Sequence, residues 1–263
     1  MDLKVIQSLA KKSDSKIVLL VMDGLGGLPR DTDGLTELEA ARTPNLDRLA
    51  GESICGLHEP VGAGVTPGSG PAHLALFGYE PLHYKVGRGV LAAMGVDFKL
   101  GPKDVACRGN FCTVDESGTI TDRRAGRLPT EKNEELTKIL QEITLSEGDV
   151  EVQTIKEHRF LVVFKGEGLS QEVADTDPHS VGLKPLDPKP ADEASAKTAR
   201  LAKEFADKAR EKLKGHEPAN MVLLRGFAQL PGWPSFEEVY GTRAACLALP
   251  RIPYGDGELR GSS

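Results

Sequence analysis

Two short stretches of the chain are apolar at every position. Residues 17–22 read Ile-Val-Leu-Leu-Val-Met, and residues 221–224 read Met-Val-Leu-Leu. Continuous apolar runs of strand length are typical of strands buried on both faces of a parallel sheet. We therefore predict a buried strand at each run, in an α/β core where helices separate the strands.

The middle of the chain has a different pattern, in which apolar and polar residues alternate over short stretches. This period of two is typical of strands with one buried face, and turn-forming residues separate the stretches. Residues 131–143 have helical spacing instead. We predict strands over residues 109–115, 150–155 and 159–164.

Helix signals stand on both sides of this middle section. Thr43 followed by Pro44 is typical of an N-cap and a first helical position, so we predict a helix from residue 44. Asp192 is the expected N-cap of a long helix with an apolar stripe, which ends near Gly215.

These patterns divide the chain into two parts. The proline-rich residues 183–190 mark the end of the alternating section. We predict an α/β core formed by residues 1–103 and 191–263, interrupted by an inserted α+β domain of residues 104–190. A chain of 263 residues is long enough to bury one core with a smaller attached domain.

The charge of the chain limits the ligands it can take. The formal net charge of −6 argues against nucleic acid as the main partner, because nucleic-acid binding requires a basic surface. A small anionic substrate remains open, since only the local charge in a cleft matters for it. The four cysteines form no Cys-x-x-Cys pair, and neither a signal peptide nor a membrane-length apolar run is visible. We expect free thiols and a cytoplasmic location.

Two loops carry candidate catalytic residues. Asp23 follows the first apolar run and precedes glycine, so its carboxylate can reach a divalent cation; the alternative is a residue that only caps a turn. Ser69 lies in a glycine-rich turn that opens a helix, where free N–H groups favour an attacking alkoxide or a phosphoserine; the alternative is a helix cap. An acid and a serine of this kind together suit phosphoryl transfer through a covalent intermediate.

Basic residues form a second candidate group. Arginine forks match phosphate and carboxylate, although a solvated charged face is the commoner origin of such residues. Residues 175–179, Asp-Thr-Asp-Pro-His, suit a metal ion, the orientation of an arginine, or a simple turn. The candidate substrate-binding residues are Arg108, Arg123, Arg124, Arg127, His158, Arg159, Asp175, Asp177, His179 and Arg225.

Together these motifs resemble the archaeal-type, cofactor-independent phosphoglycerate mutases of the alkaline phosphatase superfamily. The most specific likenesses are the serine loop, residues 64–79, and the Asp-Arg-Arg-Ala-Gly-Arg run, residues 122–127. The likeness extends to about Ala248. Shorter matches occur in the same order at residues 21–26, 43–47, 87–89, 108–111, 158–159, 175–179 and 220–226.

The resemblance implies an alkaline-phosphatase-like core and an enzyme that interconverts 3-phosphoglycerate and 2-phosphoglycerate in glycolysis. Ser69 matches the nucleophile of the family, and the reaction passes through a phosphoserine intermediate. Asp23 and Ser69 match metal ligands in a centre with two divalent ions, typically manganese, magnesium or zinc. The arginines and His158 would hold the phosphate and the carboxylate in a cleft between the core and the inserted domain.

The family carries later metal-ligand motifs, Asp-x-x-x-His and Asp-His-Ser, and neither occurs in residues 180–263 of this sequence. We therefore interpret the chain as truncated at its C-terminal end and expect no turnover from it alone. The alternatives are a metal-dependent phosphatase or sulfatase of the same superfamily, in which water accepts the phosphoryl group, and a non-catalytic remnant. Besides phosphoglycerate, the partners we consider are a second copy of the chain and a complementing C-terminal chain.

Overall fold

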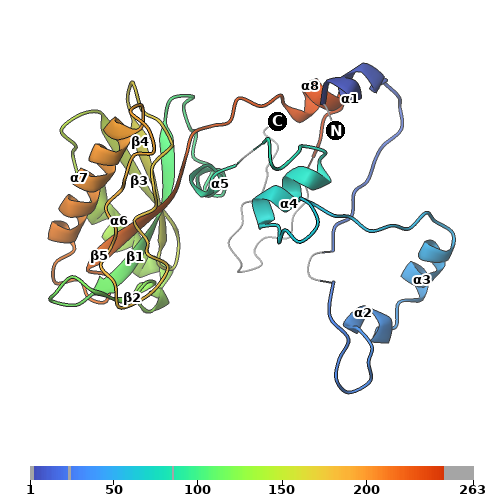
Figure 1. Cartoon of the computed structure of the whole chain (residues 1–263), viewed down its shortest axis with the longest axis horizontal. Coiled ribbons are helices and arrows are strands. Elements are labelled where there is room, and N and C mark those ends of the chain that lie inside the picture. The colour runs from blue at the N-terminus through green and yellow to red at the C-terminus, as the bar shows by residue number, and fades with distance from the viewer. Residues whose placement is uncertain (1–2, 23–24, 85, 246–263) are drawn as a thin grey trace.

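An antiparallel sheet of five strands organises the largest part of the molecule (Figure 1). The computed structural model describes residues 3–22, 25–84 and 86–245. The central strand β1 pairs with β4, β5 and β2, and β3 pairs with β4. The strands are β1 (Val105–Val114), β2 (Ile120–Asp122), β3 (Asp149–Lys156), β4 (Arg159–Lys165) and β5 (Met221–Ala228).

The alternating pattern of the middle section produces these strands. Each predicted strand of that section is found, as β1, β3 and β4, and the apolar run at residues 221–224 begins β5. The predicted helices are found as α3 (Pro44–Gly51), α6 (Thr130–Gln141) and α7 (Ala196–Lys212). Asp192 is not the N-cap of α7, because its carboxylate accepts the N–H of Ser195, and Ser195 occupies the cap.

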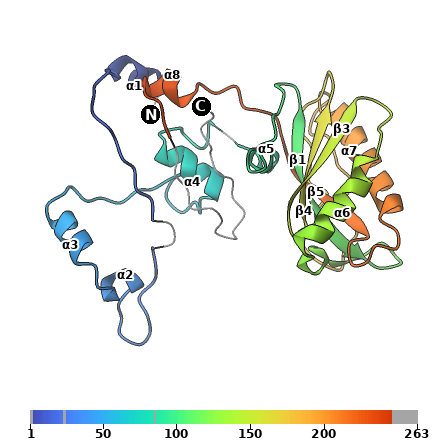
Figure 2. The ribbon, with the colours of Figure 1, turned by 180° about the vertical axis from the view of Figure 1, so that it is seen from behind.

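One face of the sheet carries the main hydrophobic core. The helices α6 and α7 cover this face (Figure 2), and their apolar stripes meet the sheet at Leu136, Leu140 and Phe205. The aromatic rings Phe111 and Phe160 lie with their centroids 4.5 Å apart in this core. Full burial of such a side chain stabilises the fold by about 1.5–3 kcal/mol.

The opposite face of the sheet is apolar at its two ends and polar between them. The short helix α5 (Arg88–Met94) covers one end, where Ala93 packs on Ala106 and Leu161. Gly89 permits this approach, because a Cβ at this position would lie 2.0 Å from the carbonyl oxygen of Ala106. The other end is closed by Cys112, Val114, Ile120, Met221 and Leu223.

A second, smaller core joins the two ends of the described chain. It forms between α1 (Leu3–Leu9), α4 (Ser69–Leu76) and α8 (Phe236–Tyr240). The Tyr240 hydroxyl donates to the carbonyl oxygen of Phe77 at 2.5 Å and so ties α8 to the end of α4. The short helix α2 (Glu37–Ala40) lies with α3 on an extended arm beyond this core (Figure 1). None of the described helices has the length and apolarity needed to cross a bilayer.

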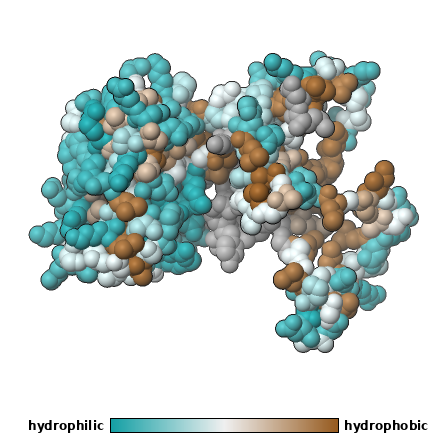
Figure 3. All heavy atoms as spheres, viewed as in Figure 1, coloured by the Kyte–Doolittle hydropathy of each residue, from teal (hydrophilic) through white to brown (hydrophobic). Residues whose placement is uncertain are grey.

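The prediction of a buried strand at residues 17–22 is wrong for this structure. The backbone there has no strand partner among the described residues, and Ile17 and Val18 are 91% and 87% exposed. A strand of a parallel sheet needs neighbours on both sides and helices on both faces. All strand pairs among the described residues are antiparallel and belong to the sheet around β1, so the run has nothing to pair with. Figure 3 shows apolar side chains gathered on the surface of this part of the molecule.

The division of the chain at residue 190 stays a prediction. In the structure, α7 and β5 come from the C-terminal side of that division, and they share the hydrophobic core of β1 and β4. The sheet therefore combines residues from both predicted parts. The described residues that follow β5 lead to α8 and the second core.

The substitution Gly109→Ala tests the packing of β1. A Cβ at this position would lie 2.2 Å from the Phe160 ring, and overpacking of this kind costs about 1–3 kcal/mol. We expect the free energy of unfolding, measured by urea titration, to fall by that amount. The control is Gly232→Ala, where no atom lies within 4 Å and the change should stay within about 0.5 kcal/mol. Equal effects of the two substitutions would contradict this packing.

Candidate functional site

The polar middle of the sheet face is built from three neighbouring elements. Arg108 on β1 lies directly opposite Arg225 on β5, so both side chains project from the same face. Arg88, at the start of α5, lies against Gly226 of β5, which follows Arg225 in the chain. Gly226 has φ +63°, and a Cβ there would lie 2.6 Å from the Cβ of Arg88. Glycine is therefore required for Arg88 to lie beside Arg225.

A buried carboxylate holds two arginines of this site. Nε and Nη2 of Arg123 donate to the two oxygens of Asp177 at 2.8 Å each, and Nη1 of Arg225 lies 3.3 Å from Asp177 Oδ2. The Asp177 side chain is fully buried. Burial opposes its charged form, but the hydrogen bonds from Arg123 and from the backbone N–H of His179 outweigh burial, so the pKa of Asp177 lies below its ordinary value. Asp177 therefore stays ionised and fixes both guanidinium groups.

His179 and Asp175 complete the support of Arg225. Nδ1 of His179 lies 3.3 Å from Nη2 of Arg225 and 3.4 Å from Nη2 of Arg123. Arginine only donates hydrogen bonds, so Nδ1 is the acceptor in these contacts. Asp175 accepts the backbone N–H of Gly226 at 2.7 Å and lies 3.7 Å from Nε of Arg225.

These contacts match one of the roles predicted for residues 175–179. Both acids and the imidazole contact arginines or the backbone that carries them, which is the orienting role. Within the described ranges, no group of three or more His, Cys, Asp and Glu side chains could hold a metal ion.

A second basic cluster surrounds His158 in the turn between β3 and β4. The His158 side chain is buried, and its Nδ1 has no hydrogen-bond partner among the described residues. Burial, together with the positive charges of Arg159, Arg124, Arg127 and Arg108, lowers the pKa of His158 to about 4. The imidazole is therefore neutral at pH 7, and an incoming anion would offset the surrounding positive charge.

The arginine-rich run at residues 122–127 forms a tight turn after β2. The Asp122 carboxylate accepts the N–H groups of Arg124 at 2.8 Å and of Gly126 at 2.7 Å. The turn includes the 3₁₀ helix η1 (Ala125–Arg127), and Arg127 has a positive φ of 52°. This turn sends Arg123 toward Asp177, while Arg124 and Arg127 add positive charge around His158.

The two predicted catalytic residues lie in the N-terminal part. Asp23 lies outside the described residues. Ser69 is the first residue of α4, after the N-cap Gly68. A Cβ on Gly70 would lie 3.0 Å from Val86 and 3.6 Å from Leu91, so the first turn of α4 packs against α5. The helix that begins at Ser69 is therefore linked through α5 to the sheet face that carries the arginines (Figure 2).

Two residues of this face were missing from the predicted site. Arg88 belongs to the matching stretch at residues 87–89 but not to the predicted site. The close approaches at Gly89 and Gly226 place it beside Arg225. Asn110 alternates in phase with Arg108 on β1 and lies opposite Arg159 on β4. The alternation along β1 was the available signal for Asn110, because it puts polar residues 108 and 110 on one face.

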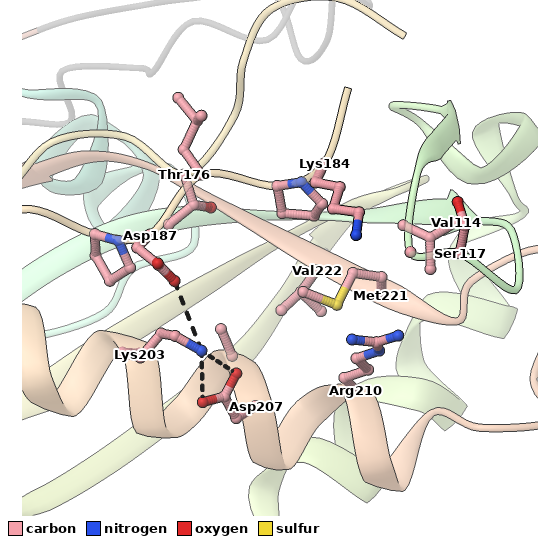
Figure 4. Close-up of a pocket in the computed structure, with 15 residues that line it drawn as sticks. Val114, Ser117, Thr176, Lys184, Asp187, Lys203, Asp207, Arg210, Met221 and Val222 are labelled. Carbon is pink, nitrogen blue, oxygen red and sulfur yellow. Dashed lines mark hydrogen bonds and ion pairs between the residues drawn. The ribbon is translucent and has the colours of Figure 1, made fainter. Parts of the chain in front are cut away.

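A separate cavity lies at the edge of the sheet beyond β5. Its volume is about 160 Å³, and its walls come from α7, the β1–β2 turn and residues 184–188 (Figure 4). Lys203 on α7 is paired there with Asp207 and Asp187. Thr176 lines this cavity, and its hydroxyl accepts the N–H of Leu224 at 2.8 Å. The cavity contains none of the predicted site residues.

The arginines and the buried carboxylate that holds two of them form a positively charged section of the sheet face, and guanidinium groups of this kind match small anions. Comparison with known proteins gives the family. Residues 50–219 match the model of the family described as 2,3-bisphosphoglycerate-independent phosphoglycerate mutase. The chain belongs to this family.

Similar proteins include probable 2,3-bisphosphoglycerate-independent phosphoglycerate mutases of two bacteria. The Thermus thermophilus protein is 53% identical over 248 residues, which cover 93% of this chain and 61% of that protein. The Deinococcus radiodurans protein is 49% identical over 252 residues, which cover 94% of this chain and 61% of that protein. The solved cofactor-independent phosphoglycerate mutase of Thermoplasma acidophilum is 35% identical with a TM-score of 0.62, covering 87% of this chain and 63% of that one. This chain thus spans about 61% of the length of the two bacterial relatives.

The low pKa of His158 predicts a pH dependence of stability. The folded chain binds a proton at His158 only near pH 4, whereas the unfolded chain does so near the ordinary value of 6.5. The free energy of unfolding should therefore fall as the pH is lowered from 6.5 toward 4. In His158→Gln this contribution disappears, so urea titrations at several pH values should give a flatter profile. An unchanged profile would contradict the neutral, buried state of His158.

The substitution Asp177→Asn tests the support of the arginines. It removes the charge that compensates Arg123 and Arg225, and breaking a buried ion pair in this way costs on the order of 3 kcal/mol. Asp187→Asn is the matched control, because the exposed Asp187 makes only a surface pair with Lys203 and should change stability by less than about 1 kcal/mol. Chemical denaturation measures both changes. A loss of stability no larger than that of the control would show that Asp177 does not stabilise Arg123 and Arg225.

Proposed function

We propose that this chain supplies the substrate-binding face and the nucleophile of a phosphoglycerate mutase, which interconverts 3-phosphoglycerate and 2-phosphoglycerate in glycolysis. The observation that carries the proposal is the pair Arg123 and Arg225, fixed on the buried carboxylate of Asp177. Rigidly held guanidinium groups suit the phosphate and carboxylate of such a substrate, because each offers parallel N–H donors. Family membership supports the same reaction.

In the proposed reaction, the chain holds the substrate while its phosphoryl group moves. The Ser69 hydroxyl oxygen attacks phosphorus, a serine–phosphorus ester forms, and the ester bond to the first glycerate oxygen breaks. The other glycerate hydroxyl then attacks the phosphoserine and restores the free serine. Arg123 and Arg225 would retain glycerate between the steps. The neutral His158 can donate to a phosphate oxygen or accept from a hydroxyl.

The proposed mutase also uses divalent ions, which we assign on family resemblance to Asp23 and Ser69 as ligands. Manganese, magnesium or zinc, when bound, would favour the deprotonated serine and offset charge on the phosphoryl oxygens. The described residues supply no cluster that fits such a centre. We therefore expect no turnover from this chain without further metal ligands.

A phosphatase or sulfatase of the superfamily is the alternative reaction. Such an enzyme would transfer the group to water, and the arginines that retain glycerate favour the mutase instead.

We also propose that the exposed run at residues 17–22 accepts strands from a complementing polypeptide, because its side chains are apolar and its backbone lacks strand partners among the described residues. The assembly would act in the cytoplasm.

Titration calorimetry with 3-phosphoglycerate tests the proposal. We expect the purified chain to bind, Ser69→Ala to bind equally well, and Arg225→Gln to bind about 10–100-fold more weakly, since a hydrogen bond to a charged group is worth about 1.5–3 kcal/mol. An enolase-coupled assay with added manganese should show no turnover by the chain alone. Absence of binding by the unaltered, folded chain would overturn the proposal. Turnover that Ser69→Ala abolishes would overturn only the expectation that more ligands are needed.

A further inference from the structure

We propose that Asn110 binds the free hydroxyl group of the substrate and so makes the site selective for a hydroxy acid. This inference rests on the proposed function and deepens it, because it assigns a third recognition element beside the phosphate and the carboxylate. The first observation is the position of Asn110. It lies on β1 two residues from Arg108, and opposite Arg159 on β4, on the polar middle of the sheet face.

The second observation is that the side-chain oxygen of Asn110 is buried without a hydrogen-bond partner among the described residues. Only 5% of the residue is exposed, and its side-chain oxygen Oδ1 has no partner among the described residues. A buried acceptor of this kind destabilises the fold unless it gains a partner. Native structures contain few such groups, and a ligand is one of the explanations for them.

Two other asparagines, Asn133 on α6 and Asn220 just before β5, show what a structural role looks like in this molecule. Asn133 donates to the carbonyl oxygens of Glu157 at 2.6 Å and Arg159 at 2.8 Å, and it accepts from Thr137. Asn220 makes a pair of 2.8 Å hydrogen bonds with the backbone of Val114. Both amides are engaged at both ends, whereas the oxygen of Asn110 is not.

The third observation is the chemistry of the neighbours. Arginine side chains are donors only, so they recognise the anionic groups of a substrate but cannot accept a hydrogen bond from its hydroxyl. Asn110 supplies an acceptor amid these donors. A hydroxyl group can both donate and accept, and it therefore satisfies an amide in either orientation. A three-carbon acid with one phosphate, one carboxylate and one free hydroxyl fits the combined set of arginines and Asn110.

The test separates a ligand-binding role from a structural one by two measurements on the full chain. Asn110→Leu removes the unsatisfied group with little change in size. We expect its melting temperature without ligand to be unchanged or higher, whereas the control Asn133→Leu, which breaks three hydrogen bonds, should melt at a lower temperature. A decrease for Asn110→Leu as large as that of the control would overturn the inference.

The second measurement compares 3-phosphoglycerate with 3-phosphooxypropanoate, which lacks the 2-hydroxyl. We expect the unaltered chain to bind 3-phosphoglycerate roughly 10–100-fold more tightly, because the analogue leaves the buried Asn110 unpaired. Asn110→Leu should bind the two ligands about equally. Equal binding of both ligands by the unaltered chain would overturn this inference alone. Failure to bind either ligand would overturn the proposed function, and this inference with it.

Discussion

The polar middle of the sheet face depends on one buried carboxylate. Asp177 lies where water is excluded, and it remains ionised because Arg123 and Arg225 approach it from separate segments of the chain. A carboxylate with these partners restricts each guanidinium group to one orientation. The cost of removing three charges from water is met by hydrogen bonds rather than by packing. The site is therefore ordered before any ligand arrives, and ligand binding needs little further loss of side-chain freedom.

The same constraint explains the layout of the sheet face. Apolar residues close both ends, under α5 and beside β2, and they leave a short polar section in which charged groups interact at low dielectric. A neutral imidazole suits this section. His158 lies among positive charges that disfavour a further proton, so it adds hydrogen-bonding capacity without adding charge.

Local patterns were sufficient to predict β1, β3, β4, the start of β5 and the helices α6 and α7, because alternation and helical spacing are properties of neighbouring residues. The contact between Arg123 and Asp177 joins residues 54 positions apart, and no local pattern contains it. Arg88 escaped prediction for a similar reason, since its place depends on glycines of α5 and β5 that meet only in the folded chain. The error at residues 17–22 has a different origin. An apolar run reports a tendency to be buried, but the burial itself depends on partner strands, which the described residues do not supply.

The exposed run at residues 17–22 also affects how this chain behaves in concentrated solution. Six apolar residues without charge, proline or glycine, presented with unpaired backbone groups, have the sequence signature of segments that stack into cross-β ladders. Identical copies satisfy one another in such a ladder, since each backbone pairs with the copies above and below. A complementary polypeptide of the kind proposed above would therefore compete with other molecules of the same chain for one surface, and the outcome would depend on their relative concentrations. Self-association would remove the chain from solution while the arginine site itself stays folded.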